Sequence, residues 1–94
     1  MFESIDDITI NYEEGDVLLV KELDKEILSK GAWTTIVFKY QDWSPKNEEY
    51  GKIKYTIRRY RKLNGEYQQK SKFNISSPDQ ARKLITTLQK FLDE

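Results

Sequence analysis

Apolar side chains recur at helical spacing over the last part of the chain. Ser77 is a suitable N-cap, Pro78 fits the first helical position, and Gln80 stands where a capping box needs it. The apolar residues that follow at this spacing are Ala81, Leu84, Ile85, Leu88 and Leu92, with Phe91 beside them. The pattern predicts an amphipathic helix of about four turns whose apolar face lies on another apolar surface.

Upstream of this helix, runs of β-branched and aromatic residues separated by turn signals predict strands. We expect four strands, over residues 17–28, 32–42, 52–62 and 67–75. Lys30-Gly31 and the segment around Pro45 predict turns, and Asn64-Gly65 predicts a tight hairpin. The expected fold class is α+β: a four-stranded antiparallel β-meander followed by one C-terminal α-helix.

Alternation along the strands assigns side chains to two faces of the sheet. One face is expected to carry the helix and form the core, and its predicted members are Ile36, Phe38, Ile53, Tyr55, Ile57, Phe73 and Ile75. The other face is predicted to collect cations and aromatic rings, which form the candidate binding site: Trp33, Lys39, Lys54, Arg58, Tyr60, Lys70 and Lys72. The same alternation sends Arg59 and Arg61 away from Arg58 and Tyr60.

Charge is distributed unevenly, although the net charge is zero. Residues 1–30 hold nine acids and three lysines, whereas residues 39–72 hold ten bases and four acids. This asymmetry suggests a polyanionic partner for the basic half, unless the two halves neutralise each other in the fold. Residues 1–15 are interpreted as an acidic N-terminal arm or an extra edge strand, and residues 16–94 as a β-β-β-β-α nucleic-acid-binding domain.

The 94 residues fit one domain and contain neither cysteine nor histidine. This composition excludes disulfides, thiolate nucleophiles, imidazole bases and the common zinc sites, and we expect no enzyme activity, no metal and no cofactor. The first residues lack a signal-peptide pattern, and the longest aliphatic run, Val17–Val20, is too short for a membrane span. A cytoplasmic location is expected, nucleoid-associated in a prokaryote, with no membrane partner.

The mixed surface of cations and rings suits single-stranded nucleic acid. Cations attract phosphates and release counterions, and rings stack on unpaired bases at roughly 1–3 kcal/mol per base. The expected function is largely sequence-independent, non-catalytic binding of single-stranded DNA. Two alternatives stay open: a protein–protein adaptor whose basic face docks an acidic partner, and a binder of single-stranded RNA.

Three short motifs followed by a capped helix resemble the single-stranded-DNA-binding domain of the eukaryotic transcriptional coactivator positive cofactor 4 and its bacterial and phage relatives. The motifs are Tyr55-Thr56-Ile57-Arg58-Arg59-Tyr60-Arg61, Asn64-Gly65-Glu66 and Lys70-Ser71-Lys72-Phe73-Asn74-Ile75-Ser76. Lys30-Gly31-Ala32-Trp33 is similar to the Lys-Gly-Trp of the bacterial relatives. The likeness covers about residues 17–92.

The resemblance implies a curved sheet, a homodimer formed through the C-terminal helices and sheet edges, and a role in transcription, replication or repair. It implies that Arg58 contacts DNA from the third strand and that Lys72 lies near the basic residue of the last strand. Arg61 stands where the eukaryotic protein has a stacking Trp, and Phe73-Asn74 stands where the family commonly has Lys-Gly. The remaining candidates for stacking on bases are Trp33, Tyr40 and Tyr60.

Overall fold

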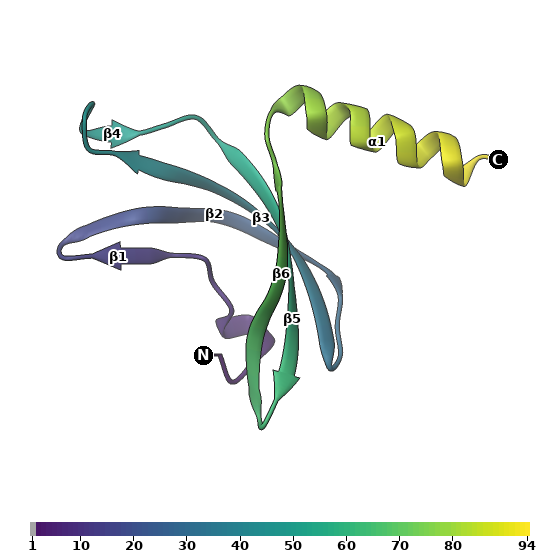
Figure 1. Ribbon diagram of the computed structural model, residues 1–94, viewed down its shortest axis with the longest axis horizontal. Coiled ribbons are helices and arrows are strands. Elements are labelled where there is room, and N and C mark those ends of the chain that lie inside the picture. Colours follow the sequence, from purple (N-terminus) through teal and green to yellow (C-terminus); the bar gives the residue numbers. More distant parts are fainter. Residues whose placement is uncertain (1) are drawn as a thin grey trace.

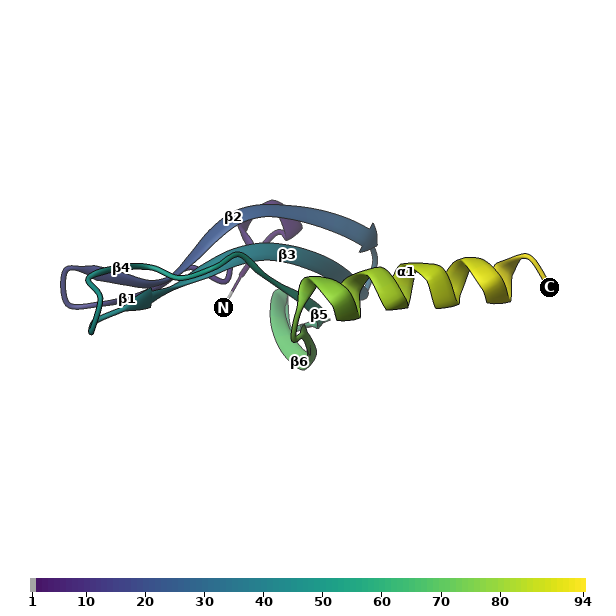
Figure 2. The ribbon, with the colours of Figure 1, turned by 90° about the horizontal axis from the view of Figure 1, so that it is seen from above.

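The computed structural model describes residues 2–94 as a curled sheet with a projecting helix (Figures 1 and 2). Its elements are the 3-10 helix η1 (Ile5–Asp7), the strands β1 (Tyr12–Glu14), β2 (Val17–Ser29), β3 (Trp33–Ser44), β4 (Glu49–Tyr50), β5 (Lys54–Leu63) and β6 (Glu66–Ile75), and the helix α1 (Pro78–Leu92). Antiparallel pairing gives the order β1-β2-β3-β5-β6, and β4 pairs with the end of β3. The molecule measures 50 × 38 × 17 Å.

The α+β class and the antiparallel sheet with a C-terminal helix are confirmed, but the expected number of strands is wrong. Within residues 2–94 the sheet has six strands instead of four. The additional strands, β1 and β4, are short pieces that fold back on the ends of β2 and β3. The rings of Trp43 and Tyr50 hold β4 in place by packing edge to face, with their centroids 5.1 Å apart.

The tight turn between β5 and β6 is confirmed. Asn64 and Gly65 have φ angles of 53° and 80°. A two-residue turn of type I′ needs positive φ at both central positions, and asparagine followed by glycine meets this need with little strain. The turn therefore fixes the register of the hairpin that carries seven of the ten bases between residues 39 and 72.

The core lies on one side of the sheet, which we call the arm face because residues 2–11, the arm, lie across it. Its buried sheet residues are Thr34, Ile36, Phe38, Tyr40, Thr56, Tyr60 and Tyr67. From the arm, Ile8 and Ile10 complete this core and are 0% and 7% exposed. Burying one isoleucine in this way contributes about 1.5–3 kcal/mol, so the arm is a structural part of the domain.

Two polar side chains of β2 hold the backbone of the arm. The Lys25 ammonium donates to three arm carbonyls, and the Glu22 carboxylate accepts from the Thr9 hydroxyl at 2.7 Å and the Ile10 N–H at 3.3 Å. The three carbonyls that Lys25 reaches are those of Ile5, Asp6 and Ile8, at 3.4, 3.1 and 2.6 Å. These bonds satisfy backbone groups that burial would otherwise leave without a partner.

The predicted membership of the sheet faces is wrong for β3. Ile36 pairs with Arg58 and Val37 pairs with Ile57, and directly paired residues share a face. Ile36 and Phe38 therefore lie with Arg58 on the arm face, whereas Ile57 lies on the opposite side. The error comes from register, because a shift of one residue between two strands moves every side chain of one strand to the other face.

Helix α1 begins as predicted, but its expected packing on the core is wrong. The Gln80 N–H donates to the Ser77 hydroxyl at 3.0 Å, and the Gln80 side chain accepts from the Ser76 N–H at 2.6 Å. No residue of α1 is buried, and its last turns extend past the sheet (Figures 1 and 2). The arm, and not the helix, covers the core.

The arm's role predicts the effect of Ile8→Ala. Removing these buried carbons should lower the free energy of unfolding by about 2–5 kcal/mol, measured by urea denaturation. Glu3→Ala, a change at an exposed position in the same arm, serves as the control and should stay within about 0.5 kcal/mol. Equal stability of the Ile8→Ala variant and the unchanged protein would contradict a structural role for the arm.

Candidate nucleic-acid interface

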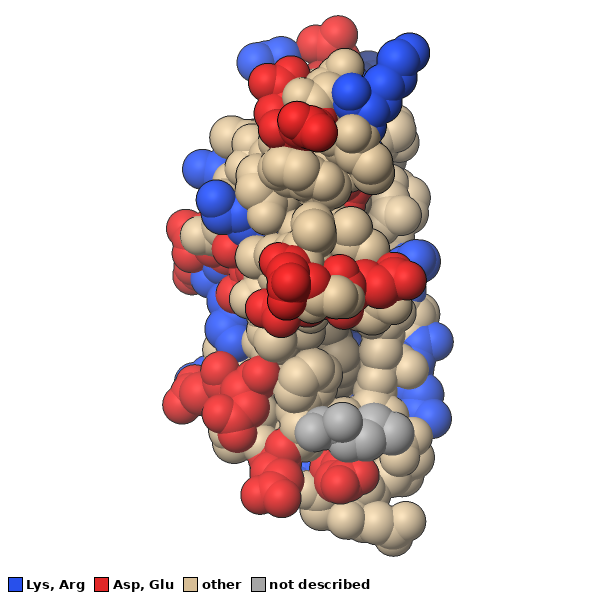
Figure 3. Space-filling model, turned by 90° about the vertical axis from the view of Figure 1, so that its left-hand side faces the viewer, with Lys and Arg blue, Asp and Glu red and all other residues tan. Residues whose placement is uncertain are grey.

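Acidic side chains gather at two turns of the molecule, whereas the β5–β6 hairpin carries mainly cations. The turns after β1 and after β3 carry exposed acids, and acids gather on the side of the molecule shown in Figure 3. These turn and strand-end acids are Glu13, Glu14, Asp16, Glu48 and Glu49. Seven of the ten bases between residues 39 and 72 belong instead to the β5–β6 hairpin. The asymmetry in sequence is therefore also an asymmetry in space.

Direct contacts do not neutralise the two halves of the sequence. Residues 2–94 contain two ion pairs, Lys54 with Asp42 at 2.9 Å and Arg82 with Asp79 at 3.1 Å. Neither pair joins residues 1–30 to residues 39–72. The bases of the second segment thus remain available to an outside anion, apart from Lys54.

Six cations of the β5–β6 hairpin form the candidate site, which we call the basic hairpin. They are Arg58, Arg59, Arg61, Lys62, Lys70 and Lys72. In the described part of the chain, no carboxylate lies within 4 Å of any of them. Cations concentrated in this way create a positive local potential that attracts polyanions.

On the helix face, the side of the sheet that carries Val37 and Ile57, a tryptophan lies beside two arginines. Trp33 pairs with Arg61 across β3 and β5, and the Arg59 and Arg61 guanidinium carbons lie 4.4 and 5.1 Å from its ring centroid. The Trp33 residue is 38% exposed. Stacking orients the guanidinium groups and leaves their in-plane N–H donors open to an anion.

On the arm face, Arg58 and Lys72 are direct cross-strand partners. Arg58 donates from Nη1 to the Gln69 side-chain oxygen at 3.0 Å, and Lys72 is exposed. The expectation that Tyr60 stacks on bases is wrong, because this residue is 2% exposed and its ring packs edge to face against Phe2. Tyrosine 60 is therefore a core residue.

The remaining candidates are dispersed. Tyr40, expected as a possible stacking ring, is 8% exposed and belongs to the core. Lys39 shares the helix face with Trp33, but six residues along a strand separate them by roughly 20 Å. Lys54 donates to Asp42 at 2.9 Å, and this hydrogen bond, with the attraction between the charges, raises the pKa of the Lys54 ammonium.

The seven residues predicted as one surface consequently lie on two. Those on the helix face are Trp33, Lys39 and Lys70, and those on the arm face are Lys54, Arg58, Tyr60 and Lys72. Arg59 and Arg61 were not among the predicted site residues, although they flank Trp33. The pairing of Trp33 with Arg61 would have revealed them, but that pairing depends on strand register.

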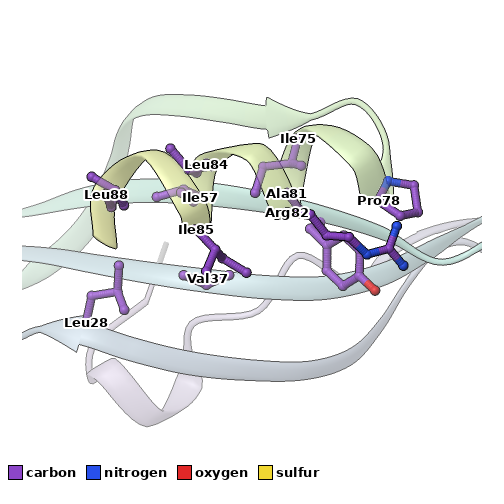
Figure 4. A pocket seen from close by; sticks show the side chains of 11 residues that line it. Leu28, Val37, Ile57, Ile75, Pro78, Ala81, Arg82, Leu84, Ile85 and Leu88 are labelled. Carbon is purple, nitrogen blue, oxygen red and sulfur yellow. The ribbon is translucent and has the colours of Figure 1, made fainter. Parts of the chain in front are cut away.

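The helix face also carries an open apolar groove beneath α1, with a volume of about 580 Å³. Figure 4 shows side chains of α1 opposite side chains of the sheet across this groove. Representative lining residues are Leu28, Val37, Ile57, Leu84, Ile85 and Leu88. Ile85 and Leu88 are 67% and 51% exposed, so the apolar stripe of the helix lacks a cover within the described chain.

No family model, curated protein or solved structure matches this chain. Among residues 2–94, no helix is long and apolar enough to cross a membrane. The same residues contain no group of three or more acidic side chains placed to hold a metal ion.

The core position of Tyr60 predicts a specific alkaline transition. Burial raises the pKa of its phenol above the ordinary value of 10.0, although the neighbouring Arg58 cation opposes this shift. The unfolded chain then loses the proton first, so the stability contributed by the neutral phenol is complete below about pH 10 and is lost as the pH rises through the folded-state pKa.

Tyr60→Phe should therefore reduce the loss of stability above this pH, measured as denaturation midpoints across a pH series. Tyr12→Phe, at a residue that is 55% exposed, is the control and should leave the alkaline slope unchanged. An alkaline slope that is the same in Tyr60→Phe and in the unchanged protein would refute the assignment.

Proposed function

We propose that this protein is a non-catalytic, dimeric binding protein for single-stranded nucleic acid, with DNA as the preferred ligand. The supporting observation is the basic hairpin, six cations without a carboxylate partner in residues 2–94, next to the partly exposed Trp33. Membership of the positive cofactor 4-like group, suggested by the motifs in this hairpin, is part of the proposal. A role in transcription, replication or repair follows from that membership.

Phosphate contacts would supply most of the affinity. A cation that neutralises a phosphate releases condensed counterions, and for single strands the slope of log affinity against log salt is about −0.7 per contact. Arg59 and Arg61 present planar forks of donors, which match two phosphate oxygens at once. Contacts of this kind go to the backbone of the ligand, so binding would be largely independent of sequence.

Aromatic stacking would favour unpaired ligands over duplexes. A base can stack on the exposed part of the Trp33 ring or on the exposed guanidinium plane of Arg59. A duplex hides the faces of its bases and offers only its backbone to the same surface. The Trp33 ring would thus supply the preference for unpaired strands over duplexes, and the cations would supply the attraction to phosphates.

Pairing of two copies through α1 is the second part of the proposal. The helix carries an exposed apolar stripe above an apolar groove, and large exposed apolar patches mark interaction surfaces. A second copy offers the same stripe, and a two-fold arrangement buries both stripes in one contact. The groove reaches Val37 and Ile57, which leaves Trp33 and Arg61 at the adjacent strand ends uncovered.

Binding is tested by titrating labelled oligothymidine at several salt concentrations, with a duplex and an oligouridine in parallel. The double variant Arg59→Ala/Arg61→Ala should bind at least roughly tenfold more weakly, with a salt slope shallower by about 0.7 per lost phosphate contact. Binding should quench Trp33 fluorescence, and Trp33→Phe should lose this signal while Trp43 still fluoresces.

Lys46→Ala is the matched control, because Lys46 is an exposed cation in the turn after β3. Its affinity and salt slope should equal those of the unchanged protein. Failure of the unchanged protein to bind any oligonucleotide at moderate salt would exclude this function and leave the adaptor interpretation. Tighter binding of oligouridine than of oligothymidine would identify RNA as the preferred ligand.

Dimerisation is tested by Leu88→Glu, which places a charge on the exposed apolar stripe of α1. Sedimentation equilibrium should show a dimer for the unchanged protein and a monomer for this variant. Lys90→Glu, an exposed change on the same helix, should remain dimeric. A monomeric unchanged protein at high concentration would contradict the proposed pairing.

A further inference from the structure

The helix-face part of the basic hairpin extends to the outermost strand of the sheet. Arg59 and Arg61 flank Trp33 on β5 and β3. Lys70, on β6, donates to the Gln68 side chain at 3.4 Å, and Gln68 is the cross-strand partner of Arg61. A row of cations therefore runs from Trp33 outward to β6.

The arm-face part reaches the same strand from the other side. Lys72 is exposed on β6 and pairs with Arg58. Arg58 Nε is the one side-chain nitrogen or oxygen among residues 2–94 that is buried without a hydrogen-bond partner. Neither Arg58 nor Lys72 has a carboxylate partner among residues 2–94, so this pair places two uncompensated positive charges next to the edge.

The outer edge of β6 lies open between these two sets of cations. Near its start, the Tyr67 N–H donates to the Phe2 carbonyl at 2.7 Å. Beyond this contact, no described segment pairs with the outer edge, and residues 69–74 are all exposed. The register shift opposite Arg59 and Tyr60 leaves Lys70 as the extra residue of a bulge, which bends the strand there.

The middle of each face lacks the features that would hold a polyanion, because the arm covers one face and apolar side chains line the other. On the arm face, Ile8 and Ile10 fill the space over Ile36 and Phe38. On the helix face, α1 and its groove lie over the middle of β3 and β5. A short path between the cations of the two faces therefore runs around the open edge of β6.

We propose that a bound single-stranded nucleic acid crosses the edge of β6, with one segment at Trp33, Arg59 and Arg61 and the next at Arg58 and Lys72. Lys70 lies at the crossing point. This inference rests on the proposed nucleic-acid-binding function and specifies the path of the ligand. Short oligonucleotides occupy the helix-face segment, and longer ones also engage the arm-face segment.

The path is tested with a series of oligothymidines of increasing length and the variants Arg59→Ala, Lys72→Ala and Lys46→Ala. Arg59→Ala should weaken binding at every length. Lys72→Ala should leave the shortest binding oligomers unaffected, and should weaken longer ones by roughly tenfold with a salt slope shallower by about 0.7. Lys46→Ala should match the unchanged protein throughout. Lys72 is exposed, so its replacement does not endanger the fold.

Two results would separate failure of the path from failure of the function. If Lys72→Ala matches the unchanged protein at every length while Arg59→Ala binds weakly, the ligand stays on the helix face and the path is wrong, although the function stands. If the unchanged protein binds no oligomer, the proposed function fails. Weakening by Lys72→Ala that is equal at all lengths would also overturn the crossing, because it would place Lys72 in the first contact.

Discussion

The packing of Ile8 and Ile10 against the curled sheet is the interaction on which the rest of the structure depends. Both residues are almost fully buried among the rings and branched side chains of β3 and β5. A strongly curled sheet leaves space on its concave side that its own strands do not occupy, so apolar side chains from another segment must pack there. The arm provides these side chains, and its backbone groups are satisfied by Lys25 and Glu22. With one side filled in this way, the helix is not needed to cover the core.

The helix remains exposed because the arm already covers the core. An amphipathic helix gains stability mainly by burying its apolar stripe, yet no residue of α1 is buried and its stripe faces an open groove. The N-cap bonds at Ser77 fix where the helix starts and so fix the direction of the stripe. Apolar side chains are thus buried on the arm face of the domain and remain exposed on its helix face. In the proposed dimer, the second copy would cover that face and leave the arm undisturbed.

Local features and the antiparallel order of the four long strands were predictable from the sequence, whereas the register between strands was not. Asn64-Gly65 and the capped start at Ser77 each carry their own geometry, and both were found where the pattern predicts them. The face assignments failed because alternation orders residues within a strand but does not fix its register against a neighbour. The sequence pattern also did not reveal that the arm belongs to the core. Ile8 and Ile10 read as a short β-prone piece in an acidic segment, and their partners lie far away in the sequence.

The distribution of charge supports the proposed polyanionic ligand. The chain has 16 acids and 16 bases, so it could pair most of them, yet residues 2–94 form two ion pairs. Like charges that face each other across strands destabilise a sheet, as in the Arg58–Lys72 pair. Together with the unpaired Nε of Arg58, this arrangement raises the free energy of the unbound protein. In the proposed complex, an anion bound near Arg58 and Lys72 would relieve the repulsion between these two cations and so stabilise the folded state. The repulsion within the Arg58–Lys72 pair, which destabilises the isolated domain, would thus contribute to the affinity of the proposed complex.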